Sequence, residues 1–261
     1  MSDTKDTADG AVEAGTAALR PSLELLWGAG ERPARGPKRG LSLETVVGAA
    51  VRIADAEGID TLSMRRLAGE LGTGTMSLYR YVPGKTELLD LMLDHVQVEL
   101  IEEYDPAAAE DWRGAVRAIA YGTLALHRRH PWLLRVNQSR VLLGPGSLRS
   151  MEVSMAGLRD LTDFSDPELV SVLMAVQSLA AGSARMEIEA REAAEEMGLD
   201  NDAFWAGQLP YLEKAMRSGN YPVMASLSED AFSPAFDHFA FGLERLIDGF
   251  GVLVDQRLAA R

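Results

Sequence analysis

One short stretch of the chain, GTGTMSLYRYVPGK at residues 72–85, carries side chains that suit contact with nucleic acid. Tyr79, Arg80 and Tyr81 follow one another just before a Pro-Gly pair, and a core helix would not place such side chains in succession. The hydroxyls of Tyr79 and Tyr81 can reach the phosphate oxygens of DNA. Arg80 could contact a base, a phosphate or only solvent, and these alternatives stay open.

The outer face of the same stretch has the chemistry of a base-reading surface. Leu78 and Val82 are four residues apart, so we expect both to face inward on a helix. The side chains left outside are small, hydroxylated, aromatic or cationic: Thr73, Thr75, Met76, Ser77, Tyr79 and Arg80. Hydroxyl and apolar groups meet base edges and thymine methyl groups in the major groove, so we expect this helix to enter it.

Lys85 stands at the expected start of the next helix, where a positive charge opposes the helix dipole. The position is explained if the helix end and the lysine together hold a phosphate. The alternative is a solvated lysine that slightly weakens the helix. Because the neighbouring residues also suit nucleic acid, we favour the phosphate.

Three short helices are expected to hold this surface in place. Ser42 is a suitable N-cap for the first helix, and Gly58 ends it. The second covers about residues 63–72 and the third about 73–81, with a glycine at their junction. Two short helices joined in this way have the spacing of a helix-turn-helix. A fourth, longer helix is expected to begin near Lys85.

The distribution of charge restricts nucleic-acid contact to the N-terminal part of the chain. The 261 residues have a net charge of −13, but residues 31–90 have a net charge of +1 and residues 91–261 one of −11. The acidic part would repel nucleic acid, so contact has to come through residues 31–90. Within them, residues 31–40 form a basic arm that could follow the minor groove or be a solvated linker. Its candidate DNA contacts are Arg35, Lys38 and Arg39.

The rest of the chain repeats the helical pattern with longer helices. We expect them at about 111–129, 132–141, 147–163, 166–197, 203–217 and 229–257. No alternating strand pattern is present, so the predicted fold class is all-α. Residues 1–40 are rich in Ala, Gly, Pro and charge, and we expect a mostly disordered acidic tail that ends in the basic arm.

The sequence argues against an enzyme, a cofactor and a bound metal. It has no cysteine, no glycine-rich phosphate loop and no Gly-x-Ser-x-Gly elbow. His127 and His130 have i, i+3 spacing, but Pro131 ends the helix there and nothing nearby completes a metal site. Because a secretory signal and a long apolar run are also missing, we expect a cytoplasmic protein without membrane contact.

Residues 62–93, LSMRRLAGELGTGTMSLYRYVPGKTELLDLML, resemble the DNA-binding head of the TetR family of bacterial transcriptional repressors. The shared pattern is Arg-x-Leu-Ala-x-x-Leu-Gly, then Leu-Tyr-x-x-Val and Lys-x-x-Leu-Leu. The resemblance covers about residues 42–93. Residues 241–250, FGLERLIDGF, resemble the C-terminal helix of the branch that contains the tetracycline repressor.

The resemblance implies roles for individual residues of the head. Arg65 would reach a base from the second helix. The base-reading residues of the third helix would be Thr75, Met76 and Ser77. Phosphate contacts are implied for Ser63, Tyr79, Tyr81 and Lys85.

The resemblance further implies that the acidic body dimerises and holds a small-molecule effector. Two heads on a two-fold axis would read half-sites about one helical turn apart, roughly 34–36 Å. The last helix and residues 166–182 carry more apolar surface than one stripe needs, which favours a four-helix interface over a core helix within one chain. The predicted interface residues are Leu173, Val176, Phe239, Leu243, Leu246 and Phe250. Pocket candidates are stray polar or large side chains on apolar helices: His127, Trp132, Asn137, Met151, Met155, Met174, Gln177, Arg185 and Trp205.

These observations predict a tail at residues 1–40, a helix-turn-helix domain at 41–89 and a ligand-binding and dimerisation domain at 90–261. We expect a homodimeric repressor, released from a palindromic double-stranded DNA operator by a small hydrophobic or multi-ring molecule. The resemblance alone implies an exporter as the regulated gene. The alternative is a DNA-binding regulator without a small-molecule ligand, either constitutive or gated by a protein partner.

Overall fold

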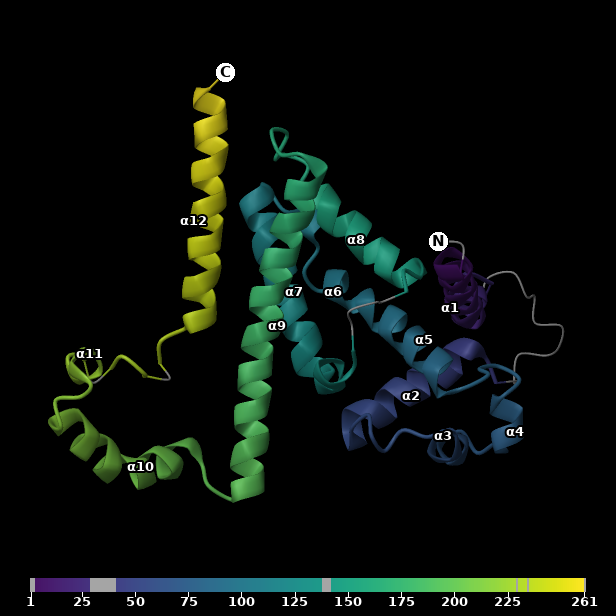
Figure 1. Cartoon of the computed structure of the whole chain (residues 1–261), viewed down its shortest axis with the longest axis horizontal. Helices are drawn as coiled ribbons and strands as arrows, with labels where there is room; N and C mark the ends of the chain where they lie inside the picture. Colours follow the sequence, from purple (N-terminus) through teal and green to yellow (C-terminus); the bar gives the residue numbers. More distant parts are fainter. Residues whose placement is uncertain (1–2, 29–40, 138–141, 229, 234, 261) are drawn as a thin grey trace. The chain divides into compact units, whose positions relative to one another are not determined.

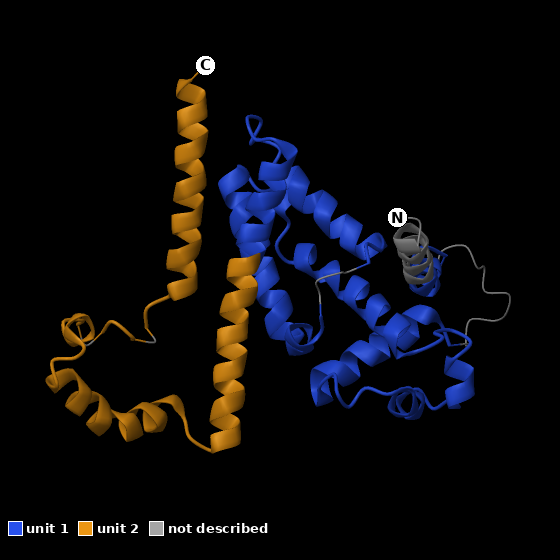
Figure 2. Cartoon of the chain, in the orientation of Figure 1, with its two compact units in different colours: residues 1–177 blue, residues 178–261 orange. Residues whose placement is uncertain are grey.

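The computed structural model describes residues 3–28, 41–137, 142–228, 230–233 and 235–260 (Figure 1). Within these residues all regular elements are helices, which confirms the all-α class. The basic arm, with Arg35, Lys38 and Arg39, lies outside the described residues. The chain divides into two compact units, residues 1–177 and residues 178–261 (Figure 2).

Three helices form the head of the first unit, as the sequence predicts: α2 (Leu43–Glu57), α3 (Met64–Glu70) and α4 (Thr75–Leu78). The Ser42 hydroxyl caps α2 by accepting a hydrogen bond from the Thr45 amide at 3.0 Å. Gly58 ends α2 with a φ of 82°, a conformation that other residues rarely adopt. The apolar face of α2, which includes Val46, Ala50 and Ile53, is buried in the core.

The body of the first unit follows the head in the chain. Its elements are α5 (Lys85–Gln97), α6 (Glu99–Glu102), η1 (Pro106–Ala108), α7 (Trp112–Arg129), η2 (Pro131–Arg135), α8 (Pro145–Gly157) and the first part of α9 (Asp166–Met197). Helix α5 packs against α2 and against α8, so it connects the head with the body (Figure 1). Leu126, Trp132 and Leu133 of the body join the core cluster of the head.

The N-terminal segment differs from the expectation of disorder. Residues Asp3–Gly28 form one helix, α1, which continues through Pro21. Its last turns pack on α5, where Leu26 is buried and the Ser22 hydroxyl donates to Oδ2 of Asp90 at 2.5 Å. The sequence offers several alanines, which favour helix, but the stabilising contacts lie 68 residues away in the chain. Local composition therefore gave the wrong prediction for this segment.

The second unit contains the rest of α9, followed by α10 (Asn201–Arg217), α11 (Pro222–Ala225) and α12 (His238–Ala259). Helix α10 includes Pro210 and has no buried residue. Within this unit α12 passes close to α9, because a Cβ atom on Gly242 would touch the side chain of Leu179 at 3.6 Å.

Three predicted helices of the body are wrong in extent. The one expected at 147–163 is α8, which ends at Gly157. The one expected at 132–141 is only the short η2, which ends at Arg135. The one expected at 229–257 begins at His238, where Asp237 caps α12 by accepting from the Ala240 amide at 2.8 Å. In contrast, the predicted bounds of α9 are those of the structure.

One helix of the described residues, α9, is long and apolar enough to cross a membrane by length and composition. These two properties are weak evidence, because the core helices of soluble proteins share them. Part of α9 is buried within the chain, including Val172, Val176 and Ala180.

Candidate nucleic-acid interface

The turn between α3 and α4 gives the head its helix-turn-helix geometry. Gly72 has a φ of 60°, in the left-handed region that favours glycine, and this redirects the chain after α3. The Thr73 amide then donates to the carbonyl oxygen of Ala68 at 3.0 Å. At the other end of α3, the Ser63 hydroxyl accepts from the Arg66 amide at 3.1 Å and caps the helix.

The inner face of helix α4 packs on the core of the head, and its outer face is accessible to solvent. Leu78 and Val82 are fully buried, which confirms their inward orientation. Met76 is 79% exposed, and its neighbours Thr75 and Ser77 are half-buried. The three candidate base-reading residues therefore occupy one accessible surface, as a helix that enters a groove requires.

The regular part of α4 is shorter than the predicted helix of residues 73–81, because it covers only Thr75–Leu78. The following residues continue as turns, in which the Val82 amide donates to the carbonyl oxygen of Leu78 at 3.0 Å. Pro83 follows directly and disfavours helical geometry in the residue before it. Tyr79 and Arg80 are exposed, whereas the ring of Tyr81 packs partly against the core.

Two neighbouring arginines of α3 have different surroundings. The guanidinium of Arg66 pairs with Glu57 at 2.5 Å and with Glu70 at 2.9 Å. The hydrogen bond from Arg66 lowers the pKa of Glu57, and the two carboxylates raise the pKa of Arg66. Arg65 is exposed on α3 and projects from the same helix-turn-helix. Arg66 therefore supports the head, while Arg65 is accessible to a base.

Lys85 occupies the first position of α5 and is exposed. The N-cap residue of α5 is Gly84, which has no side chain to cap the helix. The amides of the first turn and the Lys85 ammonium can thus face the same phosphate. The phosphate contact of Lys85 stays a prediction.

The nine pocket candidates differ in how far they are buried. Two of them are buried: His127, whose ring bonds the Thr123 carbonyl oxygen at 2.9 Å, and Trp132, whose indole donates to Asp55 of the head. The partly buried candidates are Met155 and Gln177. The exposed candidates are Asn137, Met151, Met174, Arg185 and Trp205. No group of three or more metal-ligating side chains occurs among the described residues.

The predicted dimer residues are largely part of the chain's own core. Four of them are buried: Leu173, Val176, Phe239 and Leu243. Leu246 and Phe250 are partly buried. The same two helices also expose large apolar side chains: Val170 and Met174 on α9, and Phe241 and Val252 on α12. Each of these two helices therefore has buried apolar residues and exposed apolar residues. This explains why their sequences contain more apolar residues than one buried stripe needs.

Sequence reasoning missed two polar features of the body. The buried carboxylate of Asp94, on α5, accepts from the amides of Gly146 at 3.0 Å and Ser147 at 2.8 Å, so it caps the N-terminus of α8. The hydroxyls of Ser147 and Ser154 are buried and have no hydrogen-bond partner within the described part of the chain. In the sequence these residues are one isolated aspartate and two separate serines, so no local pattern indicated the helix cap or the buried hydroxyls.

Comparison with known families agrees with this geometry. Residues 46–92 match the family described as "Bacterial regulatory proteins, tetR family", and residues 105–254 match "Tetracyclin repressor-like, C-terminal domain". The first match contains the helix-turn-helix, and the second covers most of the chain that follows it.

Three individual proteins are similar along most of the chain. The HTH-type transcriptional repressor DrrR1 of Streptomyces coeruleorubidus is 55% identical over 260 residues, which cover 98% of this chain and 95% of the relative. The tetracycline repressor protein class A from transposon 1721 of Escherichia coli is 30% identical and covers 85% and 94%. The crystal structure of the Streptomyces coelicolor protein ActR in complex with actinorhodin is 28% identical, covers 82% and 99%, and has a TM-score of 0.53.

Proposed function

The chain belongs to the TetR family of bacterial transcriptional repressors, and we propose that a small hydrophobic or multi-ring molecule releases it from a palindromic operator. The operator would lie beside the gene that the protein controls, which we propose to be an exporter gene. The site of action would be the cytoplasm, where operator and effector meet. The proposal has three parts, which concern DNA, the dimer and the effector.

DNA contact would come from the exposed face of α3 and α4. Arg65 and the α4 residues Thr75, Met76 and Ser77 would read bases. Ser63, Tyr79 and Lys85 border this face and would hold phosphates. Tyr81 would use only its hydroxyl, because its ring packs partly on the core. Arg80 is exposed beside them and is compatible with either kind of contact.

A homodimer would bring two such heads to one operator. The body is strongly acidic, so each head has to bind against a repulsive background and gains little affinity alone. Met174 is 62% exposed on α9, and Phe241 is more than half exposed on α12. Apolar side chains of this size on helices favour burial against a second copy of the chain. Two-fold symmetry would then match the symmetry of a palindrome.

The observation that carries the effector proposal is the pair of buried, unpaired hydroxyls on α8. A buried hydroxyl without a partner costs about 1–3 kcal/mol, so Ser147 and Ser154 gain when a polar group reaches them. Both lie on the helix that Asp94 attaches to α5. An effector that displaces α8 would therefore also displace α5, the helix that connects the body with the head. The structure of the similar protein ActR in complex with actinorhodin supports a small-molecule effector for this chain.

The test uses the full chain and fluorescently labelled duplexes from the DNA upstream of its own gene and of the neighbouring gene. We expect two chains per duplex by sedimentation, with tight binding to one palindrome. A set of multi-ring antibiotics is then screened for an increase in melting temperature and for release of the duplex. Failure to bind any duplex, or binding as a monomer, would contradict the repressor proposal.

A serine variant separates the effector from the operator. Ser154→Ala should weaken binding of the active compound and leave operator affinity unchanged, because Ser154 lies in the body. Ser226→Ala is the matched control, since Ser226 is exposed and its hydroxyl donates to the Val223 carbonyl oxygen. If the operator is bound but no compound releases it, the regulator without a small-molecule ligand becomes the better description.

A further inference from the structure

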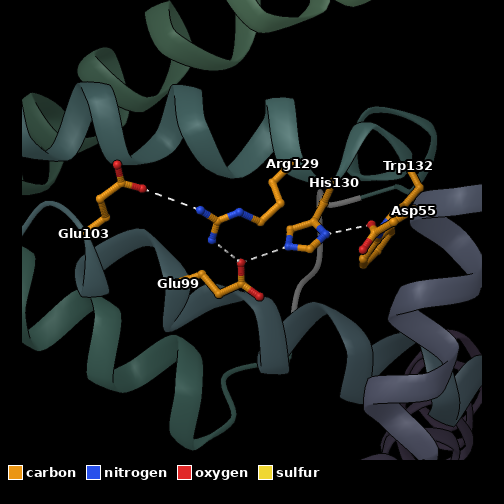
Figure 3. A network of polar contacts seen from close by, with 6 residues as sticks. All are labelled: Asp55, Glu99, Glu103, Arg129, His130 and Trp132. Atoms are coloured by element: carbon orange, nitrogen blue, oxygen red, sulfur yellow. Dashed lines mark hydrogen bonds and ion pairs between the residues drawn. The ribbon is translucent and has the colours of Figure 1, made fainter.

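The head and the body of the first unit meet at a polar cluster, which we name the head–body joint (Figure 3). It consists of Asp55 from α2, Glu99 from α6, Arg129 and His130 at the end of α7, and Trp132 of η2. Nδ1 of His130 lies 2.7 Å from Oδ1 of Asp55, and Nε2 lies 3.0 Å from Oε2 of Glu99. One histidine ring thus joins a helix of the head to a helix of the body.

Each carboxylate of the joint has a second partner. The indole N–H of Trp132 donates to the same Asp55 oxygen at 2.8 Å. The guanidinium of Arg129 donates to the same Glu99 oxygen at 2.8 Å and also pairs with Glu103 at 3.5 Å. Figure 3 shows the histidine ring between the two carboxylates, with Arg129 beside it. These shared contacts hold both carboxylates in place on either side of the ring.

The geometry requires a charged ring. A neutral imidazole has one N–H donor, but both ring nitrogens of His130 face carboxylates, which only accept when ionised. Burial disfavours the charge, since the side chain is only 3% exposed, but the hydrogen bonds and negative charges of Asp55 and Glu99 outweigh it and raise the pKa of His130. Burial likewise opposes the charge of Glu99, but hydrogen bonds from Arg129 and His130 lower the pKa of that carboxyl.

The joint adds a polar connection to the other contacts between head and body. Helix α5 continues from the head into the body and packs on α8, and Leu126, Trp132 and Leu133 pack into the core of the head. Apolar packing is not directional and permits small rotations of one part on the other. The joint holds α2, which supports α3 and α4, through Asp55, whereas Glu99 lies just after α5. A directional polar contact to α2 thus restricts an orientation that apolar packing alone would leave more variable.

We propose that His130 is a positioning residue whose charged ring fixes the orientation of the head on the body, and thereby sets the half-site spacing that the dimer accepts. This inference rests on the proposed function, because spacing matters only to a dimer on a palindrome. One added base pair moves the half-sites apart by about 3.4 Å and rotates them by roughly 35°. A rigid joint resists this change, whereas a loosened joint lets the heads adjust.

The experiment measures operator affinity against spacer length. Palindromes with the native spacer, and with one base pair added or removed, are titrated with the full chain. We expect the native protein to lose about tenfold or more in affinity on each altered spacer, and His130→Gln to lose less than about threefold. Preference for the bases within each half-site should stay as in the native protein. The matched control is His95→Gln, because His95 is exposed on α5 and should keep the native spacer profile.

A pH series adds a readout that a purely structural role would not move. As the pH rises and His130 loses its charge, the native protein should come to tolerate altered spacers, and His130→Gln should show no such trend. The charged groups that face the ring or its partners are Asp55, Glu99, Arg129 and Glu103. Circular dichroism verifies that each variant folds, and Asp55→Asn replaces His130→Gln if the latter does not.

The outcomes separate the inference from the function on which it rests. If the native protein binds no palindrome, the proposed function fails. If it binds but shows no spacer preference, or if His130→Gln or Asp55→Asn keeps the native preference, the role of His130 is overturned. A loss of affinity that is equal on all spacers would likewise contradict a positioning role.

Discussion

Replacing Asp94 by alanine removes a carboxylate that attaches α8 to the connecting helix α5. Asp94 is 7% exposed and accepts two backbone hydrogen bonds, from Gly146 and Ser147. The contact is close, because a Cβ atom on Gly144 would lie 2.5 Å from the carboxylate. Water therefore has little room to replace the lost oxygen atoms.

The magnitude follows from the two bonds. A hydrogen bond to a charged group contributes about 1.5–3 kcal/mol, and relief of the carboxylate's desolvation offsets part of the sum. We expect Asp94→Ala to lower the free energy of unfolding by about 3 kcal/mol, which is roughly a 6–12 °C decrease in melting temperature. Asp94→Asn keeps one acceptor oxygen, so it should cost about half as much.

The assay is equilibrium unfolding in urea, followed by the fluorescence of Trp112 and Trp132, which are buried in the first unit. Asp60→Ala is the matched control, because Asp60 is exposed in the turn between α2 and α3. A loss for Asp94→Ala that equals the loss for Asp60→Ala would refute the reasoning. So would an Asp94→Asn variant that is less stable than Asp94→Ala.

Three further predictions concern the head and the joint. Arg65→Ala should cost about 1–3 kcal/mol of operator binding and relax specificity at one base pair. Arg66→Ala should not change base preference, because Glu57 and Glu70 engage that side chain. Equal effects of the two variants in a binding titration would argue against Arg65 as a base-reading residue. Lys85→Ala should weaken binding to all sequences alike and reduce the slope of log affinity against log salt by about 1, and a sequence-selective loss would exclude a phosphate contact. The difference in unfolding free energy between the native protein and His130→Gln should be largest below about pH 6.5. It should disappear as the pH rises through the raised pKa of His130. A difference that grows with pH in urea titrations would contradict a charged His130 ring.

The sequence predicts the head well because its signals are local. Caps such as Ser42 and Ser63, glycines at turns and apolar residues four apart each act within a few residues of the chain. Leu78 and Val82 are buried as expected, and this fixes which face of α4 is open. The exposed face of the candidate interface follows directly from that choice.

The remaining features depend on contacts between distant residues. Asp55 and His130 are 75 positions apart, and Ser22 and Asp90 are 68 apart, so no periodic pattern announces either pair. The sequence treats His130 only as a helix-end histidine, and Trp132 as a pocket candidate. Both side chains instead hold the joint, because tertiary packing decides which partner a buried polar group finds.

The attachment of α4 to the head affects how the protein's preference for operator sequences could change under the proposed function. Leu78 and Val82 attach the helix to the head, while the side chain of Met76 extends into solvent and contributes little to folding. If these residues read bases as proposed, substitutions at Thr75, Met76 and Ser77 should alter the recognised sequence at small cost in stability. Under the proposed function, the residues that read DNA would be different from the residues that stabilise the fold, so the target sequence could change while the scaffold stays the same. This separation would also make this helix the natural position at which to redirect the protein to a chosen operator.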